Sequence, residues 1–268
     1  MNTVNIVKAG VFFMIIAVCG CSRTEIIAHR GSSFAAPENT VAAAQLAWEQ
    51  GCRAVEIDVY LTGDNRVMVM HDYSTKRTTG VAMDIETADS LSLRTLDAGQ
   101  WKGAAFAGQK VPFIEEIIDI MPPDGVLFVE LKSGKKIVPF VAEIVKNDPK
   151  SAQICFIAFD LETISAAKNA MPENKAYWIC GTKFDETRQK HIPHGRDLID
   201  VVKEHKLDGL DVNYKGVTEI FCEQVKEAGL GLYVWTVDDC EDAERMKKYG
   251  VDGITTNKPV DIRECLRN

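Results

Sequence analysis

The sequence of 268 residues lacks the features that mark several large classes of protein. No low-complexity or linker-like stretch follows residue 25, and 46% of the residues are hydrophobic while 26% are charged. This balance excludes an intrinsically disordered or collagen-like chain. Basic residues are in deficit, with 31 Lys and Arg against 39 Asp and Glu. Because nucleic-acid-binding proteins carry the opposite balance, we expect no nucleic-acid partner. No feature predicts a protein partner either.

Long apolar runs and closely paired cysteines are also missing. The longest run near the N-terminus, Val11–Val18, is shorter than the roughly 20 residues that span a bilayer, which excludes a multi-span membrane protein. No C-x-x-C pair follows residue 25, so neither a zinc ribbon nor a thioredoxin-type motif is supported. Cys155 and Cys180 stand inside apolar runs and are typical of small core residues. We predict no disulfide framework.

The N-terminus has the pattern of an export signal. One basic residue, Lys8, precedes the apolar run, and Cys19-Gly20-Cys21 follows it. This end resembles a bacterial lipobox, with a small residue before the lipidated cysteine. We predict that residues 1–20 are a lipoprotein signal peptide, cleaved before Cys21, and that residues 21–268 form the mature domain. An ordinary secretory signal peptide is the alternative. The lipobox implies a lipid anchor in the bacterial cell envelope, facing the periplasm or the cell surface.

The rest of the chain alternates short β-rich runs with helical patterns. The β-rich runs are Ile26–His29, Ala54–Tyr60, Val126–Leu131, Ile154–Phe159, Ala176–Cys180, Gly209–Asn213, Leu232–Thr236 and Gly253–Thr256. The helical patterns are Asn39–Trp48, Phe113–Ile120, Lys136–Lys146, Leu161–Asn169, Arg196–His205, Thr218–Ala228 and Glu241–Tyr249. Near-continuous apolar strands that alternate with helices predict a parallel sheet buried on both faces. We expect a single (β/α)8 barrel, with a doubly wound open sheet as the alternative.

One segment interrupts this alternation after the second strand. Val67–His71 is a further β-like run, and residues 72–112 show no clear periodicity. We predict an insertion between the second and third strands of the barrel. Long loops after barrel strands lie at the carboxyl-terminal face, where active sites of such barrels are found.

Polar side chains gather at the carboxyl ends of the predicted strands. They are His29, Arg30, Glu56, Asp58, His71, Glu130, Lys132 and Trp235. Residues two apart on a strand share a side, so Glu56 and Asp58 point the same way, as do Glu130 and Lys132. Three inward carboxylates beside two cations repel one another unless a further cation is bound. An oxygen-only ligand set favours Mg²⁺ or Ca²⁺, and an ion-pair network with Arg30 and Lys132 is the alternative.

These residues carry a family resemblance over about residues 25–262. The segments His29-Arg30-Gly31, Pro37-Glu38-Asn39-Thr40, Glu56-Ile57-Asp58 and His71-Asp72 resemble the signature of glycerophosphodiester phosphodiesterases. Val129–Lys132, Tyr233–Asp239 and Gly253–Pro259 agree with it. The resemblance implies a TIM barrel with one divalent metal ion that hydrolyses glycerophosphodiesters, which are small-molecule substrates, to sn-glycerol 3-phosphate and an alcohol.

The resemblance also implies roles for individual residues. Glu56, Asp58 and Glu130 match metal ligands, while His29 and His71 match the acid and base. Arg30 and Lys132 match phosphate-binding cations, and Trp235 matches an aromatic wall. Glu38 and Asn39 lie in the same motif, and Asn39 has two alternatives, a substrate-site role or a plain helix N-cap.

The chemistry of phosphodiester cleavage fits this set of residues. Cations stabilise an anionic transition state, and histidine transfers protons near neutral pH. Two alternatives for the first step stay open. Either water attacks the phosphorus, or the glycerol hydroxyl attacks it and gives a cyclic phosphate. Two other functions are also open: cleavage of head groups from intact phospholipids, for which Trp101 and Phe106 offer a small apolar rim, and phosphodiester binding without catalysis.

Overall fold

The computed structural model describes residues 24–267. The predicted signal peptide and the predicted lipidation site Cys21 lie outside the described residues. Within the described part, none of the helices combines the length and the hydropathy that crossing a membrane requires.

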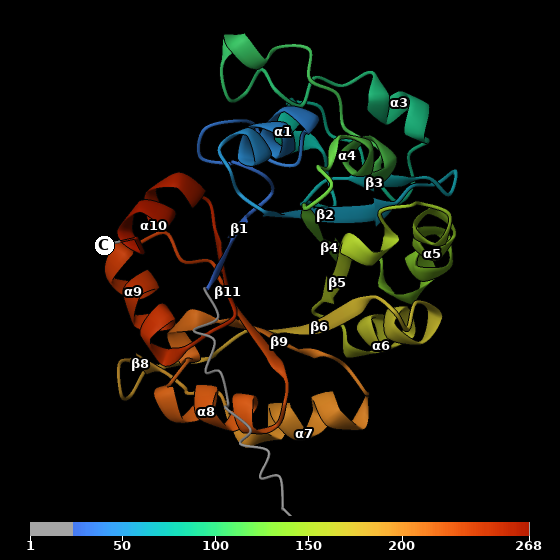
Figure 1. Ribbon diagram of the computed structural model, residues 1–268. Coiled ribbons are helices and arrows are strands. Elements are labelled where there is room, and N and C mark those ends of the chain that lie inside the picture. Colours follow the sequence, from blue (N-terminus) through green and yellow to red (C-terminus); the bar gives the residue numbers. More distant parts are fainter. Residues whose placement is uncertain (1–23, 268) are drawn as a thin grey trace, which may run out of the picture.

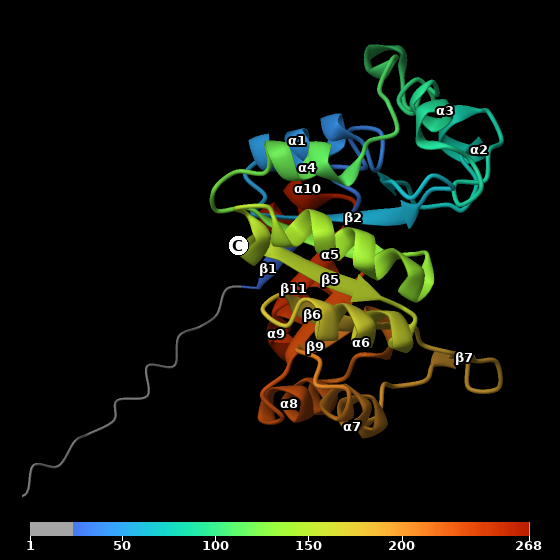
Figure 2. The ribbon, with the colours of Figure 1, turned by 90° about the vertical axis from the view of Figure 1, so that its right-hand side faces the viewer.

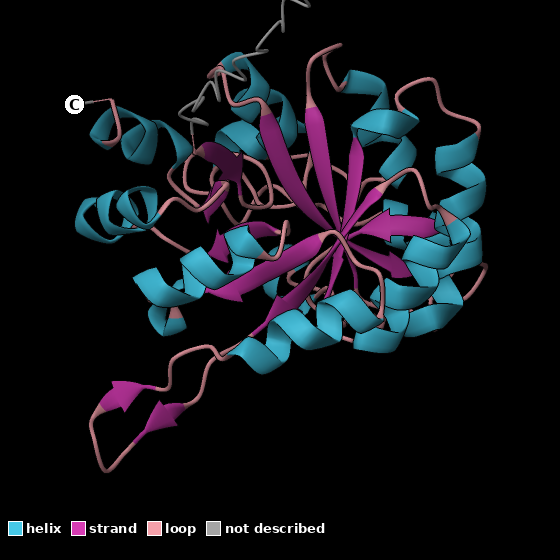
Figure 3. Cartoon of the chain, turned by 60° about the horizontal axis from the view of Figure 1, so that its bottom comes forward, coloured by secondary structure: helices cyan, strands magenta, loops and turns pink. Residues whose placement is uncertain are grey.

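Eight parallel strands close into a barrel (Figures 1 and 3). They are β1 (Glu25–Ala28), β2 (Ala54–Leu61), β4 (Val126–Leu131), β5 (Ile154–Ala158), β6 (Lys175–Cys180), β9 (Gly209–Asn213), β10 (Gly231–Trp235) and β11 (Gly253–Thr256). Closure is made by β1, which pairs with β11 on one side and with β2 on the other. The predicted (β/α)8 barrel is confirmed, and each of the eight predicted runs overlaps one of these strands, with ends that differ by at most one residue.

Helices surround the barrel as an outer layer (Figure 1). They are α1 (Val41–Glu49), α4 (Ile114–Ile120), α5 (Val138–Lys146), α6 (Leu161–Ala170), α7 (Arg196–Glu204), α8 (Glu219–Glu227), α9 (Cys240–Tyr249) and α10 (Pro259–Cys265). Short 3-10 turns are η2 (Gly134–Ile137), η3 (Ser151–Gln153) and η4 (Tyr214–Gly216). The apolar patterns predicted the first seven of these helices, and α10 was not predicted.

The main core lies between the barrel and the helices. It joins outward-facing strand residues such as Val55, Val129 and Phe156 to helix residues such as Ile117 and Phe221. A smaller cluster, which includes Ile27, Phe128 and Tyr177, fills the barrel interior. The barrel is therefore packed along its axis. Toward the carboxyl ends of the strands the interior side chains become polar, and a pocket opens there.

The insertion predicted after the second strand is present. It contains β3 (Val67–Val69), which pairs antiparallel with the end of β2, then α2 (Lys76–Thr79), α3 (Ser90–Arg94) and η1 (Ala104–Phe106). It has its own small core, which includes Met68, Leu93 and Val111.

A hairpin of β7 (Phe184–Asp185) and β8 (Lys190–His191) follows β6. In Figure 2 the hairpin and the insertion both project on the side toward which the arrows of β2 and β5 point. The two projections flank the carboxyl-terminal mouth of the barrel.

The structure corrects one prediction and excludes one of the two alternatives for Asn39. A disulfide links Cys240 at the start of α9 to Cys265 at the end of α10, whereas no disulfide framework was predicted. The sequence gives no signal for it, because the two residues are 25 apart and are brought together by the packing of α9 on α10. The N-cap of α1 is Thr40, whose hydroxyl accepts from the Ala43 amide, so Asn39 is not the cap.

Candidate active site

One pocket opens at the carboxyl ends of the barrel strands. Seven of the predicted site residues line it, namely His29, Arg30, Glu56, His71, Glu130, Lys132 and Trp235. Asp58 and Asn39 are buried beside it, at 1% and 3% exposure. The structure therefore brings all the predicted site residues of the described chain together. They come from β1, β2, β4 and β10, from the loop after β1, and, for His71, from the segment after β3 in the insertion.

The loop after β1 is shaped by two consecutive residues with positive φ. Arg30 has a φ of 54° and Gly31 has a φ of 79°. A Cβ atom at Gly31 would meet the Ala43 carbonyl carbon at 2.5 Å, so only glycine fits against α1. The turn aims the Arg30 amide at Glu56, and the N–H donates to Oε2 at 2.9 Å. Strain held in such a turn is typical of functional sites.

Glu56, Asp58 and Glu130 form a buried carboxylate cluster whose ligand oxygens lie within 4.8 Å of one another. Burial and the charges of Asp58 and Glu130 raise the pKa of Glu56 well above its usual range. Burial and the Asp58 charge raise the pKa of Glu130 to about 7. Although burial opposes ionisation, Lys132 and Arg30 lower the pKa of Asp58 to about 2. Three acids held this closely are costly without a cation between them.

Two cations lie beside this cluster, and their ion pairs involve Asp58 and Glu130. Lys132 Nζ lies 2.8 Å from Glu130 Oε1 and 3.1 Å from Asp58 Oδ1, and Arg30 Nε lies 3.3 Å from Asp58 Oδ2. Within the described chain, no Lys or Arg side chain forms an ion pair with Glu56, and the imidazole Nε2 of His29 lies 4.0 Å from its Oε2. The ion-pair network considered from sequence therefore exists, but it leaves one buried acid without a cation. The donor set fits a divalent metal ion bound by oxygen atoms.

His29 is oriented by residues from the far end of the chain. Its Nδ1 donates to Asn257 Oδ1 at 2.7 Å, and Asn257 Nδ2 donates to Asp238 Oδ2 at 2.6 Å. Because the Asn257 amide nitrogen faces Asp238, its oxygen faces His29, which makes Nδ1 the donor and leaves Nε2 toward the pocket. Burial lowers the pKa of His29 to about 4, so the imidazole is neutral near pH 7.

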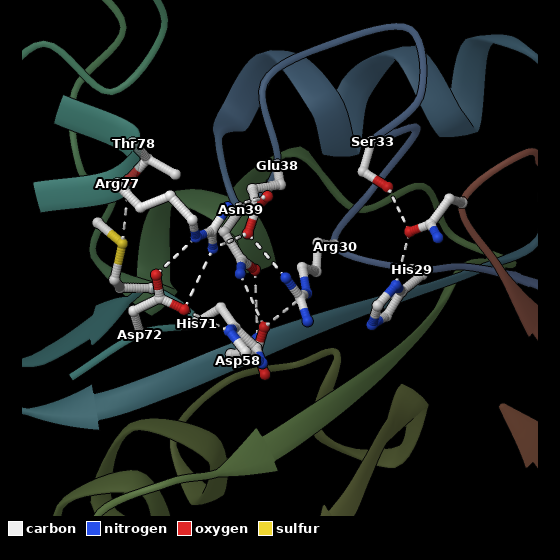
Figure 4. A network of polar contacts seen from close by, with 12 residues as sticks. His29, Arg30, Ser33, Glu38, Asn39, Asp58, His71, Asp72, Arg77 and Thr78 are labelled. Atoms are coloured by element: carbon white, nitrogen blue, oxygen red, sulfur yellow. Dashed lines mark hydrogen bonds and ion pairs between the residues drawn. The ribbon is translucent and has the colours of Figure 1, made fainter. Parts of the chain in front are cut away.

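His71 is oriented from the other side by Asp72. Its Nδ1 lies 2.7 Å from Asp72 Oδ1, and Arg77 Nε donates to Asp72 Oδ2 at 2.6 Å (Figure 4). A hydrogen bond from Arg77 lowers the pKa of Asp72, so the carboxylate is ionised and accepts from His71. Both histidines thus engage Nδ1 and leave Nε2 without a hydrogen-bond partner among the described side chains. Arg77 also donates to Glu38, which accepts from Arg30 at 2.8 Å.

Asn39 belongs to the site rather than to the helix cap. Its Nδ2 donates to Asp58 Oδ2 at 2.8 Å, and its Oδ1 accepts from the Asp58 amide at 3.2 Å (Figure 4). A φ of 56° places the side chain in this position. These two hydrogen bonds therefore fix the position of the Asp58 carboxylate.

Four residues of this arrangement were not found from the sequence: Asp211, Asn257, Asp238 and Arg77. Asp211 lies on β9 and Asn257 directly follows β11, so the search along the strands that found the other site residues applied to them as well. Arg77 lies in the short helix α2 of the insertion, and Asp238 lies in the loop after β10, inside the segment Tyr233–Asp239 that agrees with the family signature but assigned no role to this residue.

Comparisons with known proteins agree with this geometry. A model described as the glycerophosphoryl diester phosphodiesterase family matches residues 29–261. A glycerophosphodiester phosphodiesterase of Caldanaerobacter subterraneus is 31% identical over 252 residues, which cover 91% of this chain and 98% of the relative.

Solved structures show the same barrel. A phosphodiesterase of Oleispira antarctica, described in complex with the product sn-glycerol-3-phosphate, is 27% identical with a TM-score of 0.82, over 91% of this chain and 97% of the other. A glycerophosphodiester phosphodiesterase of Agrobacterium tumefaciens is 25% identical with a TM-score of 0.74, over 90% of this chain and all of the other. The chain belongs to the glycerophosphoryl diester phosphodiesterase family and is thereby a phosphoric diester hydrolase.

Proposed function

We propose that this protein hydrolyses glycerophosphodiesters to sn-glycerol 3-phosphate and an alcohol, using a divalent cation and two histidines. The observation that carries the proposal is the shared geometry of His29 and His71. Each has its Nδ1 held by an acceptor, and both border one pocket with the carboxylate cluster. The product described for the Oleispira antarctica relative supports the choice of substrate.

Glu56, Asp58 and Glu130 would hold the metal ion, and their oxygen-only donors suit Mg²⁺ or Ca²⁺. The bound ion would stabilise negative charge on the phosphoryl oxygens. Arg30 and Lys132 supply positive charge at the same pocket wall. Arginine grips two phosphate oxygens at once and lysine acts as a point charge. Together they stabilise the anionic transition state.

The histidines move protons at their Nε2 atoms. One neutral imidazole takes the proton of the attacking hydroxyl, and the other, in its protonated form, gives a proton to the leaving alcohol. Asp72 stabilises positive charge on His71, since its carboxylate lies 2.7 Å from Nδ1. Asn257 is neutral and supplies no such charge to His29.

The test is release of sn-glycerol 3-phosphate from a panel of glycerophosphodiesters, with and without a chelator. We expect metal-dependent release that His71→Ala abolishes. His205→Ala is the matched control, because His205 follows α7 and hydrogen-bonds Ser165 outside the pocket. No release with any diester or divalent ion contradicts the proposal. Release from acylated phospholipids alone would instead identify a phospholipase-type activity.

We further propose that the protein is an exported bacterial lipoprotein, acylated on Cys21. The support is the sequence pattern of residues 1–21 alone. Cells that express the protein and are fed a labelled fatty acid should label the wild type and not Cys21→Ser. Equal labelling of the two would contradict the anchor.

A further inference from the structure

A second cleft lies at the end of the barrel opposite the catalytic mouth. Its volume is about 700 Å³, and it is lined by the start of β1, the turn before β2 and the ends of α9 and α10. In Figure 2 the arrows of β2 and β5 point away from this end of the barrel. None of the residues that line the catalytic pocket lines this amino-terminal cleft, so the proposed reaction does not account for it.

The lining of the amino-terminal cleft is basic, although the chain as a whole has a net charge of −8. Its charged residues are Arg53, Lys247, Arg263 and Arg267 against one acid, Glu25. Glu25 forms an ion pair with Arg53, with 3.0 Å between Oε2 and Nε. Among residues 24–267, no ion pair includes Lys247, Arg263 or Arg267. The cleft therefore concentrates positive charge that the described acids do not neutralise.

The helix ends explain part of this charge. Lys247 donates to the Leu266 carbonyl at the end of α10, as a cation near a helix C-terminus commonly does. Arg263 stands in the last turn of α10, and a Cβ atom at Gly51 would meet its Nη1 at 3.3 Å. Its Nε is buried and has no hydrogen-bond partner among the described residues. Because such burial is costly, packing alone does not explain an arginine that lines this cleft.

A short stretch of chain connects the amino-terminal cleft to the predicted lipid anchor. Thr24 is the first described residue and lines the cleft. Only Ser22 and Arg23 separate it from Cys21, so the two ends of this stretch are at most about 11 Å apart. That distance is comparable to the Debye length of about 8 Å in physiological salt, over which a charged surface acts on exposed cations. An anchored Cys21 would therefore hold the cleft close to lipid head groups.

We propose that the amino-terminal cleft docks the protein on a membrane surface that contains anionic phospholipids, whose phosphate groups bind Arg263 and Arg267. The inference rests on the anchor proposed at Cys21 for its position and on the lining of the cleft for its chemistry. Guanidinium groups bind phosphate oxygens through paired N–H donors. Since the chain as a whole is acidic, the same surface repels its other faces, and the cleft sets the orientation.

This orientation has a consequence for the substrate. The catalytic mouth lies at the other end of the barrel strands, so it faces away from the bilayer and is open to soluble diesters. The acylated protein on vesicles should therefore hydrolyse a soluble glycerophosphodiester as fast as the protein without its anchor does. A much lower rate on vesicles would place the mouth against the bilayer and contradict the orientation.

The direct test is sedimentation with phospholipid vesicles at low salt. Residues 24–267 contain the whole barrel, so protein that starts at Ser22 keeps the fold and lacks the anchor. The wild type should bind vesicles of phosphatidylglycerol and phosphatidylcholine more strongly than vesicles of phosphatidylcholine alone. In the double variant Arg263→Gln, Arg267→Gln this preference should fall roughly 25-fold, since each basic residue near an anionic surface strengthens binding about fivefold.

The matched control is the double variant Lys183→Gln, Lys190→Gln. It removes two positive charges from exposed positions at the β7–β8 hairpin, beside the mouth, and should keep the preference. Both double variants should release sn-glycerol 3-phosphate at the wild-type rate. If Arg263→Gln disturbs α10, Lys247→Gln with Arg267→Gln repeats the test at two exposed positions.

Two results would overturn the inference. One is a wild type without preference for phosphatidylglycerol, or a preference that survives in the cleft variants. The other is an equal loss in the hairpin control, because the effect is then one of net charge alone. Binding is measured without substrate and without the anchor. Failure of the proposed hydrolysis, or equal fatty-acid labelling of Cys21→Ser and wild type, is therefore a separate result.

Discussion

The Nδ1 atom of His71 lies 2.7 Å from Oδ1 of the next residue, Asp72, and the Arg77 guanidinium holds the other carboxylate oxygen. This contact makes His71 present its Nε2 to the pocket and stabilises the imidazolium form. Arg77 also donates to Glu38, which accepts from Arg30. These hydrogen bonds connect the insertion after β2 to the loop after β1. The insertion therefore positions a predicted catalytic residue in addition to lengthening the mouth of the barrel.

Asp72→Asn should lower kcat about 10- to 100-fold while leaving KM within a few-fold, because the amide no longer stabilises a charged imidazole and can select the wrong tautomer. Steady-state kinetics with one glycerophosphodiester across pH 5–9 measure this. Asp84→Asn is the matched control, an exposed acid of the same insertion. An unchanged kcat in Asp72→Asn would refute a positioning role for this carboxylate.

Addition of Mg²⁺ or Ca²⁺ should raise the melting temperature of the metal-free protein. Binding at 100 times Kd adds about 2.7 kcal/mol to the free energy of unfolding. Glu130→Gln removes one of the three clustered carboxylates and should abolish most of this shift. Glu25→Gln serves as the control, since Glu25 pairs with Arg53 at the start of β1. A shift of equal size in Glu130→Gln would show that the ion binds elsewhere.

The double variant Cys240→Ser, Cys265→Ser should lose about 3 kcal/mol of unfolding free energy under oxidising conditions, because the disulfide restricts the unfolded chain. Urea denaturation of the wild type with and without reductant should show a difference of similar size. Reductant should leave the double variant unchanged. Free-thiol titration that finds both cysteines reduced in the native protein would rule out the bond.

Stability should depend on pH through Asp208 at the base of β9. Although burial opposes ionisation, hydrogen bonds from Lys168, Lys175 and the Ala176 amide lower the pKa of Asp208. Because the pKa of Asp208 is lower in the native protein than the unfolded-state pKa near 3.9, its ionisation adds to the free energy of unfolding above that pH. This contribution is lost as the pH falls through the native pKa. Asp208→Asn should therefore cost about 1–3 kcal/mol at pH 7.

The cost of Asp208→Asn should shrink as the pH falls below about 4, because the unfolded wild type then binds a proton that the native carboxylate, with its lowered pKa, binds only at lower pH. Urea denaturation of both proteins at pH 7, 5 and 3 provides the measurement. A difference in unfolding free energy that is constant from pH 7 to pH 3 would contradict the sign of this effect.

The sequence by itself determined the barrel and the position of most of the site. Strands buried on both faces need continuous apolar runs, so β1, β5 and β9 could be located from local pattern alone. Parallel strands of a barrel end at one face, and alternation along β2 places Glu56 and Asp58 on the inside. These rules are local and periodic, and they need no knowledge of which strand lies beside which.

Tertiary structure decided everything that depends on contacts between distant segments. Asn257 orients His29 across 228 residues, and Cys240 meets Cys265 only because α9 packs on α10. Asn39 contacts Asp58 because the backbone at Asn39 turns into a positive φ, which no periodic pattern encodes. Barrel closure sets Asp211 opposite Glu56 and Asp58 and leaves its Oδ1 without a hydrogen-bond partner among the described residues. Side-chain partners follow from packing in space, and a local pattern carries no information about them.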